Sequence, residues 1–324
     1  MIYHVSHHLL LALKMNNLEL VRRAVEETKN INEFIDVTLP YTPLHLTILL
    51  RSSLEITEYL IDKGADINSL CGESPYPNVM SKCAPLHLAI SKNKRIEIDY
   101  AELLIRRSAD VNIVCSGGQS ALHLAVRSKN LQLVNLVLRN NANVNLNSEY
   151  GSPLMVFAEN FILGLDNLDI MKLLLEFGAD ANCVSDKCPN ESLLHVVVKS
   201  GSVEALKLLM SQGSVDININ IVTVNGMTAL HYAVLSPDLN DDVIRVLLDS
   251  GINWKITDNH GICANDYYPK LLINFFYSER DTEDFLANHY FEFKEKYKET
   301  NVEESEPAGR YFNYGIDLIN ARER

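Results

Sequence analysis

The sequence predicts an all-α solenoid of helix–turn–helix units that are joined by short β-hairpin loops. The first observation is a Leu-His pair that recurs along the chain, at His45, His87, His123, His195 and His231. The variant Leu154-Met155 stands between the third pair and the fourth, so successive units begin 32 to 42 residues apart. Repetition at this period is typical of a chain that copies one supersecondary unit many times.

The second observation is the motif Gly-Ala-Asp-x-Asn, which follows an amphipathic run each time. It stands at residues 64–68 and 178–182, and in the form Ser-Ala-Asp-Val-Asn at 108–112. Looser forms are placed at 216–218, Asp-Ile-Asn, and at 251–253, Gly-Ile-Asn. The motif therefore marks the loop that ends each unit.

Residues 119–151 are the clearest copy of the unit. Leu122 opens an apolar run that is long enough for two to three helical turns. Apolar residues then recur at steps of three and four from Leu131 to Leu138, which places them on one helical face. Asn140 and Asn141 end this second helix, since asparagine tolerates a left-handed backbone. One unit alone has too little apolar surface to fold, so neighbouring units must cover it.

The opening motif is most complete at 41–46, Tyr-Thr-Pro-Leu-His-Leu, and at 227–233, Met-Thr-Ala-Leu-His-Tyr-Ala. With a period of about 33 residues, these motifs resemble those of the ankyrin-repeat family. The resemblance implies hairpin loops that project as fingers, first helices that form a concave palm, and a protein partner. It also implies that each histidine starts a helix and ties its repeat to the neighbouring turn by hydrogen bonds, instead of serving catalysis or metal binding.

The repeats suggest the following organisation. We expect an N-terminal capping repeat at 1–40, which lacks the Leu-His pair because one side of a terminal repeat faces water. Six ankyrin repeats follow, at 41–83 (with a long loop), 84–118, 119–151, 152–190, 191–226 and 227–261. A degenerate capping repeat at 262–280, a C-terminal helix at 281–299 and an acidic, disordered tail at 300–324 complete the prediction.

Composition excludes several classes of protein. No apolar run approaches the roughly 18–20 residues that a membrane-spanning helix needs, and residues 1–14 do not form a secretory signal. The formal net charge of −13 argues against nucleic-acid binding, which needs clustered lysine and arginine. We therefore expect a cytoplasmic or nuclear protein, monomeric on its own, that binds neither membranes nor nucleic acid.

The sequence contains no phosphate-binding loop, G-x-S-x-G elbow or H-E-x-x-H motif, so we expect no catalytic residue and no enzyme. Cys183 and Cys188 have a spacing at the upper edge for zinc ligands, but no second tight pair accompanies them. We expect neither a metal nor a cofactor. The six cysteines are expected to stay reduced, because we expect no export signal, with redox regulation of the thiols as an alternative.

The positions that correspond to the palm and the fingers give the candidate partner-binding residues. The ends of the first helices carry a basic row that suits an acidic partner, namely Arg51, Lys92, Arg127, Lys129 and Lys199. The expected fingertip residues are Glu73, Tyr76, Gln119, Glu149, Tyr150, Lys187, Asn225 and His260. Tyr76 is favoured because Pro75 and Pro77 flank it, and tyrosine is enriched in binding hot spots. The alternative, that these side chains are ordinary solvated turn residues, stays open.

The function that this sequence predicts is a non-catalytic protein-interaction scaffold that acts as an inhibitor or adaptor. One alternative is a substrate-receptor subunit of a ubiquitin ligase, whose C-terminal segment joins the ligase core. Residues 281–324 show no recognisable box sequence of that kind, which favours the scaffold. A weaker alternative is a pathogen-derived or virus-like effector, suggested only by the irregular repeat lengths.

Overall fold

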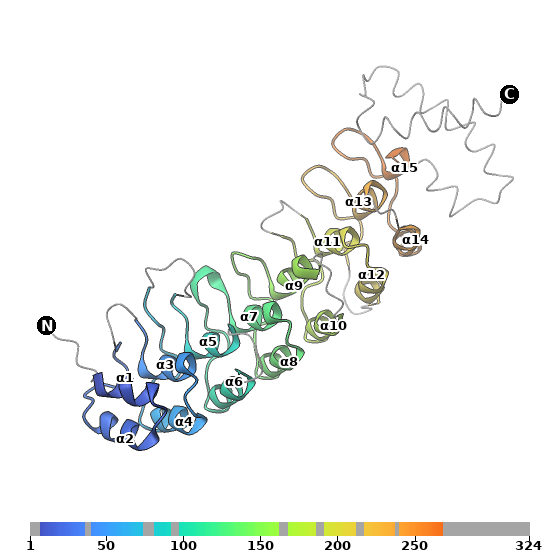
Figure 1. Cartoon of the computed structure of the whole chain (residues 1–324). Helices are drawn as coiled ribbons and strands as arrows, with labels where there is room; N and C mark the ends of the chain where they lie inside the picture. The colour runs from blue at the N-terminus through green and yellow to red at the C-terminus, as the bar shows by residue number, and fades with distance from the viewer. Residues whose placement is uncertain are drawn as a thin grey trace, which may run out of the picture. The chain divides into compact units, whose positions relative to one another are not determined.

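A computed structural model describes residues 7–35, 40–73, 81–91, 97–161, 168–185, 191–211, 217–236 and 240–267. The chain divides into two compact units, Met1–Asp180 and Ala181–Arg324. Helices are the regular elements of the described ranges, and loops that fold back as hairpins connect them (Figure 1). The predicted all-α class is therefore confirmed.

The first unit consists of five helix pairs. They are α1 (His7–Lys14) with α2 (Leu18–Glu26), α3 (Pro43–Leu50) with α4 (Leu54–Asp62), α5 (Pro85–Ser91) with α6 (Glu97–Arg106), α7 (Ala121–Ser128) with α8 (Leu131–Arg139), and α9 (Pro153–Phe161) with α10 (Leu168–Glu176). The first helices of the pairs pack side by side in one layer, and the second helices form the other layer (Figure 1). The core lies between the layers, where side chains such as Leu44, Leu86 and Leu122 are buried.

The second unit repeats this plan. It contains α11 (Leu193–Lys199) with α12 (Val203–Met210), α13 (Ala229–Leu235) with α14 (Asp241–Asp249), and the short α15 (Ala264–Tyr267). Helix α13 packs between α11 and α15, while α12 packs against α14. The proposed C-terminal helix at 281–299 and tail at 300–324 lie outside the described residues, as does the capping repeat beyond Tyr267. None of the described helices has both the length and the apolar character that a membrane span requires.

The five repeated histidines are structural, as the resemblance implied. In His123 the Nδ1 atom accepts the Ser120 backbone N–H at 3.1 Å, which closes a capping box at the start of α7. Its Nε2–H donates, at 3.1 Å, to the carbonyl of Gly151, which directly precedes Ser152 at the start of the next repeat. His45, His195 and His231 make the equivalent bond, to the carbonyls of Cys83, Met227 and Ile262, which lie at the boundary with the following repeat. His87 donates instead to the carbonyl of Ile113, within its own repeat. Four of the five histidines therefore tie their helix to the start of the next repeat.

Burial keeps these imidazoles neutral. Desolvation lowers the pKa of all five rings from the ordinary value of 6.5, and it lowers the pKa of His45 to about 4. The neutral ring has one donor nitrogen and one acceptor nitrogen, which matches the partners on its two sides: Nδ1 faces the N-cap residue and Nε2 faces a backbone carbonyl. In α9 the equivalent residue is the buried Met155, whose backbone N–H donates to Ser152 Oγ instead.

A second series of bonds links the loops that carry the aspartate and asparagine motif. Within the first unit the Oδ1 of one asparagine accepts the backbone N–H of the next repeat's motif, over 2.7–2.9 Å. The pairs are Asn32 with Asp66, Asn68 with Asp110, Asn112 with Asn143, and Asn145 with Asp180. Asn32 shows that the predicted N-terminal capping repeat at 1–40 keeps this motif although it lacks the Leu-His pair.

Of the two looser motifs in the second unit, the one at 216–218 was placed two residues too early, whereas the one at 251–253 has Asn253 in the aspartate place, as the motif predicts. Asn218 N–H donates to Asn182, so Asn218 occupies the aspartate place, and Asn220 accepts from Asn253. Matching on Asp-Ile-Asn at 216–218 failed because Asn-Ile-Asn follows directly, and the inter-repeat bonds select that later copy. In the next repeat Lys255 takes the asparagine place, and its backbone N–H donates to Asn253 Oδ1.

Candidate functional site

Backbone hydrogen bonds close the hairpin loops that connect the repeats. The Cys115 N–H donates to the carbonyl of Gln119 at 2.9 Å, and equivalent bonds close the loops at Ser148, Ser185, Thr223 and Asp258. Gly117 and Gly118 have φ angles of 79° and 71°, a left-handed conformation that glycine adopts without strain. Within each unit these fingers project from the same side of the helices (Figure 1).

Neighbouring fingers are also bonded to one another. In the first unit the Glu149 N–H donates to the Gly117 carbonyl at 3.0 Å. In the second unit the Asn259 N–H donates to the Asn225 carbonyl at the same distance. Because these neighbouring fingers are bonded to one another, their exposed side chains are arranged before any partner arrives. Such preorganisation reduces the entropy lost on binding.

The prediction that Gln119 is an exposed fingertip is wrong. Its side chain is only 6 % exposed, and its Oε1 accepts a hydrogen bond from Arg127 Nη1 at 3.0 Å. Gln119 lies at the base of the hairpin, opposite Cys115, so its side chain faces helix α7 and not solvent. The residue thus orients Arg127, whose guanidinium lies 5.7 Å from the ring centre of Tyr150. The structure brings these three predicted residues together.

Glu191 and Lys199 occupy the same two positions in the second unit. Lys199 Nζ lies 3.0 Å and 3.2 Å from the two carboxylate oxygens of Glu191, and Tyr232 donates its hydroxyl to Oε1 at 2.9 Å. Burial opposes ionisation of Glu191, but the bonds from Lys199 and Tyr232 outweigh it and hold the pKa below its usual range. Lys199 therefore belongs to an ion pair, unlike the free cation that a basic row requires.

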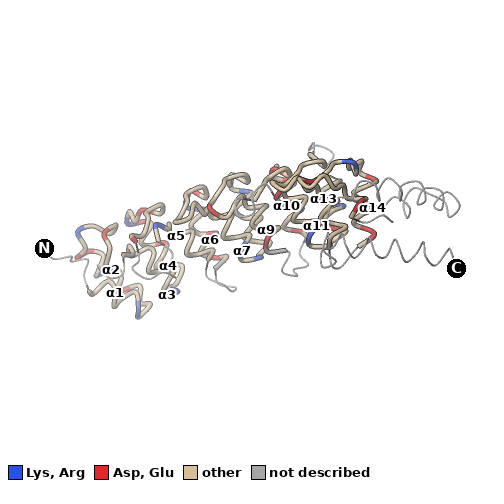
Figure 2. Tube along the Cα trace, turned by 90° about the horizontal axis from the view of Figure 1, so that it is seen from above, with Lys and Arg blue, Asp and Glu red and all other residues tan. Residues whose placement is uncertain are grey.

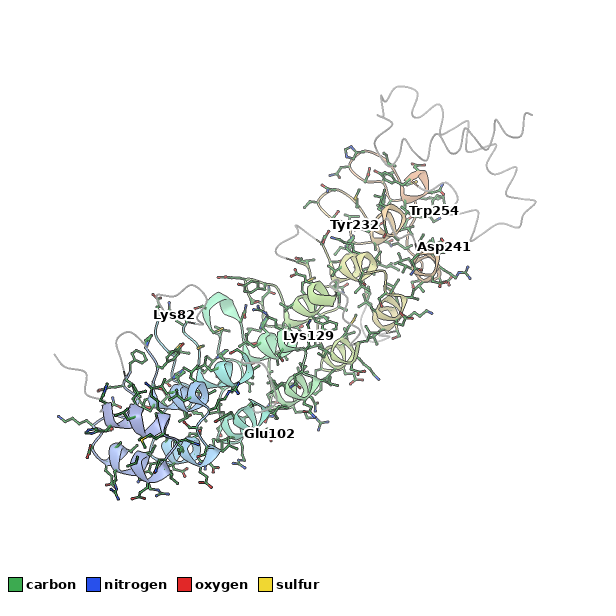
Figure 3. All side chains as sticks on the ribbon, in the orientation of Figure 1. Lys82, Glu102, Lys129, Tyr232, Asp241 and Trp254 are labelled. Atoms are coloured by element: carbon green, nitrogen blue, oxygen red, sulfur yellow. The ribbon has the colours of Figure 1, made fainter. Side chains whose placement is uncertain are left out.

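The sequence analysis did not identify Glu191 or Tyr232. A signal existed, because Glu191 and Lys199 are eight residues apart, the same interval that separates Gln119 from Arg127. Tyr232, labelled in Figure 3, comes from the following repeat. Its contact with Glu191 therefore depends on stacking within the second unit, which no local pattern contains.

The remaining cations of the predicted row differ in setting. Arg51 and Lys129 cap the C-termini of α3 and α7 in left-handed backbone conformations, with φ of 57° and 59°. Both are exposed, and neither makes a salt bridge to any residue that the structure describes. Lys92 lies outside the described residues. Figure 2 shows acidic and basic residues interspersed along each unit, so the cations do not form an unbroken basic face.

Five of the other fingertip residues are exposed in the described ranges. Glu73 forms a salt bridge with Lys82 at 2.8 Å, and the bond from that ammonium lowers the pKa of Glu73. Glu149, Asn225 and His260 are exposed at the ends of their hairpins. Tyr150 is 40 % exposed in spite of its contact with Arg127. Tyr76 and Lys187 lie outside the described residues.

Exposed apolar side chains on the fingers form a feature that the sequence reasoning mostly missed. In the first unit they are Leu70 and Val114, and in the second unit Val184, Val222 and Val224. All but Val224 stand directly before the buried residue that closes the hairpin, such as Cys71 or Cys115. That fixed position is the sequence signal by which they can be found. These residues add apolar area beside the polar fingertips.

No group of three histidine, cysteine, aspartate or glutamate side chains within the described part of the chain is arranged to hold a metal ion. The candidate site is therefore a set of side chains on hydrogen-bonded loops and helix ends. Its chemistry is that of a recognition surface: aromatic, aliphatic, cationic and hydrogen-bonding groups that face outward.

Comparison with known proteins agrees with this geometry. The family model for ankyrin repeats in three copies matches residues 69–148 and 154–258, and the single ankyrin repeat model matches 41–71. An ankyrin repeat protein of Acanthamoeba polyphaga mimivirus is 31% identical over 151 residues, which cover 47% of this chain and 18% of that protein. Human ankyrin repeat and SOCS box protein 6 is 28% identical over 227 residues, 62% of this chain and 50% of that protein.

Among solved structures, the ankyrin repeat domain of Bcl-3, a member of the IkappaB protein family, aligns with a TM-score of 0.53. The alignment covers 69% of this chain and 92% of that domain at 24% identity, a likeness of fold alone. This chain spans half or less of the length of the two curated relatives. Their similarity therefore concerns the repeats.

Proposed function

Because this chain belongs to the ankyrin-repeat family, we propose that it is a non-catalytic scaffold that binds another protein and acts as an inhibitor or adaptor. Ankyrin repeats are protein-interaction modules, which supports the general role. The observation that carries the specific proposal is the exposed Tyr150 on a hydrogen-bonded finger, with the Arg127 guanidinium beside its ring. We propose a cytoplasmic or nuclear site of action.

Tyr150 and Arg127 have the properties of binding anchors. Tyrosine and arginine are the side chains that most often dominate the energy of a protein interface, because they combine large contact area with directional bonds. Arg127 is already oriented by Gln119, so little side-chain entropy remains to be lost on binding. Glu149 on the same finger adds a hydrogen-bond acceptor. The proposed interface of the first unit is centred on this finger.

The partner proposed for this surface presents carboxylates. Arg51, Arg127 and Lys129 are the candidate cations of the first unit, and Arg51 and Lys129 have no described acidic partner. Lys199 is omitted from the set because Glu191 neutralises it. Charge complementarity of this kind raises association rates and selects among partners more than it raises affinity. Binding should therefore weaken as salt concentration increases.

The test is affinity capture from cell extract, compared by quantitative mass spectrometry between the wild-type chain and an Arg51→Asn, Lys129→Asn double variant. Asparagine tolerates the left-handed conformation at both positions, so the backbone is retained while two charges are removed. Lys172→Gln, on the outer helix α10, is the matched control. We expect the double variant to lose the partners that the control keeps. Equal capture by all three chains would rule out the cations as recognition elements.

One observation favours a second candidate, a substrate-receptor subunit of a ubiquitin ligase. The similarity to human ankyrin repeat and SOCS box protein 6 is the basis for it. Capture with the full chain and with a version that ends at Tyr277 separates the two functions. Cullin or elongin-type subunits bound only by the full chain would favour the ligase subunit. One partner set shared by both versions would favour the scaffold.

A further inference from the structure

We propose that Cys71 and Cys83 form a thiol pair that hydroperoxides oxidise reversibly to a disulfide. The two residues face each other across the neck of the long loop of the first repeat. The Cys71 N–H donates to the Cys83 carbonyl at 2.9 Å, and the two sulfur atoms lie 3.2 Å apart. The Cys83 N–H also approaches Cys71 Sγ, at 3.3 Å. Both side chains are buried.

Disulfide formation requires only a small movement of the two sulfur atoms. A disulfide requires an S–S distance of about 2.05 Å, so the two sulfur atoms need to approach by only ~1.2 Å. The backbone bond from the Cys71 N–H to the Cys83 carbonyl, 2.9 Å long, already keeps the two residues side by side. Rotation of the two side chains therefore suffices, and the backbone bond between the residues can persist.

The backbone on both sides of the pair is held in place. The Cys83 carbonyl also accepts from His45 Nε2 at 2.9 Å, and the Gly72 N–H donates to the Pro40 carbonyl at 2.9 Å. On the other side Ser116 donates both its N–H and its hydroxyl to the Ser81 carbonyl. The two thiols are thus kept together by contacts that involve three consecutive repeats. These contacts hold the thiol pair in a defined position.

The two sulfur atoms have different roles in the oxidation. The contact between the two sulfur atoms lowers the pKa of Cys71, while that same contact and burial raise the pKa of Cys83. The Cys71 thiolate attacks one oxygen of hydrogen peroxide, the O–O bond breaks, and a sulfenic acid and water form after proton transfer. Cys83 sulfur then attacks the sulfenic sulfur, the S–O bond breaks, and a second water leaves. Two thiols lose two electrons, and the peroxide gains them.

The third nearby thiol provides a contrast. Cys115 also lies at the base of a hairpin, but its thiol is directed to the Ser116 carbonyl at 3.6 Å. Burial raises the pKa of Cys115, which disfavours the reactive thiolate. Oxidation is therefore expected at the Cys71–Cys83 pair. The product closes a covalent ring over residues 71–83 and fixes the junction between the first two ankyrin repeats.

The experiment treats the full chain with hydrogen peroxide, alkylates the remaining thiols and maps the digest by mass spectrometry without reduction. We expect a cross-linked pair of peptides joining Cys71 to Cys83, two hydrogens lighter than the reduced pair and restored by dithiothreitol. The oxidised chain should melt several degrees higher, because a closed loop restricts the unfolded state. Cys115→Ser is the matched control and should form the same cross-link.

Two variants test the assigned roles. With Cys83→Ser, the sulfenic acid at Cys71 has no partner and should be labelled by a 1,3-diketone probe. With Cys71→Ser, the probe should leave Cys83 unlabelled. A wild-type chain that keeps both thiols alkylatable after peroxide treatment would overturn the proposal, as would a cross-link between Cys83 and Cys115. Because this mapping uses the wild-type chain, it decides the question even where a variant fails to fold.

Discussion

The ammonium of Lys199 lies 3.0 Å from the carboxylate of Glu191, the residue just before the Ser192 N-cap of the same helix. Tyr232 of the following repeat donates to the same carboxylate. The sequence analysis groups Lys199 with the other cations at the ends of the first helices. The structure shows that Lys199 is paired with Glu191. The inner surface of the second unit is accordingly less basic than its sequence suggests.

The ion pair predicts a dependence of stability on pH. The pKa of Glu191 is lowered on folding, so its contribution is fully present above the ordinary carboxyl pKa of about 4.3 and is lost as the pH falls through the lower folded value. Glu191→Gln should cost about 1 kcal/mol at pH 7, a modest value because Lys199 is partly exposed. Urea unfolding at pH 7, 5, 4 and 3 measures both effects.

The control for this prediction is Glu204→Gln, which removes an exposed carboxylate from α12. The wild-type chain and the control should lose stability between pH 5 and 3 more steeply than Glu191→Gln. Equal slopes for all three chains would show that Glu191 contributes no linked protonation.

The inter-repeat histidines predict acid sensitivity at a higher pH. Each pKa is lowered on folding, so the unfolded chain binds more protons below pH 6.5. For His45, whose pKa falls to about 4, the free energy of unfolding should decrease by up to about 1.4 kcal/mol per pH unit between pH 6.5 and pH 4. Thermal and urea midpoints should decrease from pH 7 to pH 5. A midpoint that stays constant over that range would contradict neutral, bonded imidazoles.

The same substitution at two leucines of the third repeat should lower the free energy of unfolding by unequal amounts. Leu122 is fully buried in α7, so Leu122→Ala should cost about 2–5 kcal/mol through the cavity it leaves. The sequence pattern indicates the same cost for Leu136, but that side chain is only half-buried in α8, where Val137 and Leu138 are buried instead. Leu136→Ala should therefore cost clearly less. Equal shifts in urea midpoint would contradict the helix faces assigned here.

The asparagine series predicts that Asn112 links two repeats. Its Oδ1 accepts the Asn143 N–H at 2.7 Å, and its Nδ2 donates to the Asn141 carbonyl at 3.0 Å. Asn112→Ala should lower the free energy of unfolding by about 1 kcal/mol, while Asn112→Asp keeps the acceptor and should cost less. Urea unfolding of both variants measures the difference. An alanine variant as stable as the wild type would mean that solvent replaces these bonds at no cost.

The fold could be predicted from the sequence because its determinants are local. Ser120 and His123 lie three residues apart, and this spacing alone sets the start of α7 and the direction of the imidazole. The same holds wherever threonine or serine precedes Leu-His. The position of Asn218 and Asn220 could not be fixed in this way, since two overlapping motifs compete and only the bond to Asn182 decides between them.

The candidate site could be predicted only in part. Exposed hairpin residues such as Glu149 and Tyr150 follow from their place in the repeat. The burial of Gln119 and the neutralisation of Lys199 do not, because each depends on a side chain eight residues away across a helix start. The contact between Tyr232 and Glu191 spans 41 residues and arises only when repeats stack. Residue type and spacing therefore predicted the exposed hairpin residues better than they predicted the charge of the surface.

Hydrogen exchange on the full chain, with and without a partner captured by it, tests the proposed binding surface most directly. The account predicts slower amide exchange at the finger around Glu149 and Tyr150 and at the end of α7 near Lys129. Exchange in the outer helices α8 and α10 should not change. Protection confined to those outer helices, with the finger unaffected, would contradict the claim that this chain recognises its partner through fingers and inner helix ends.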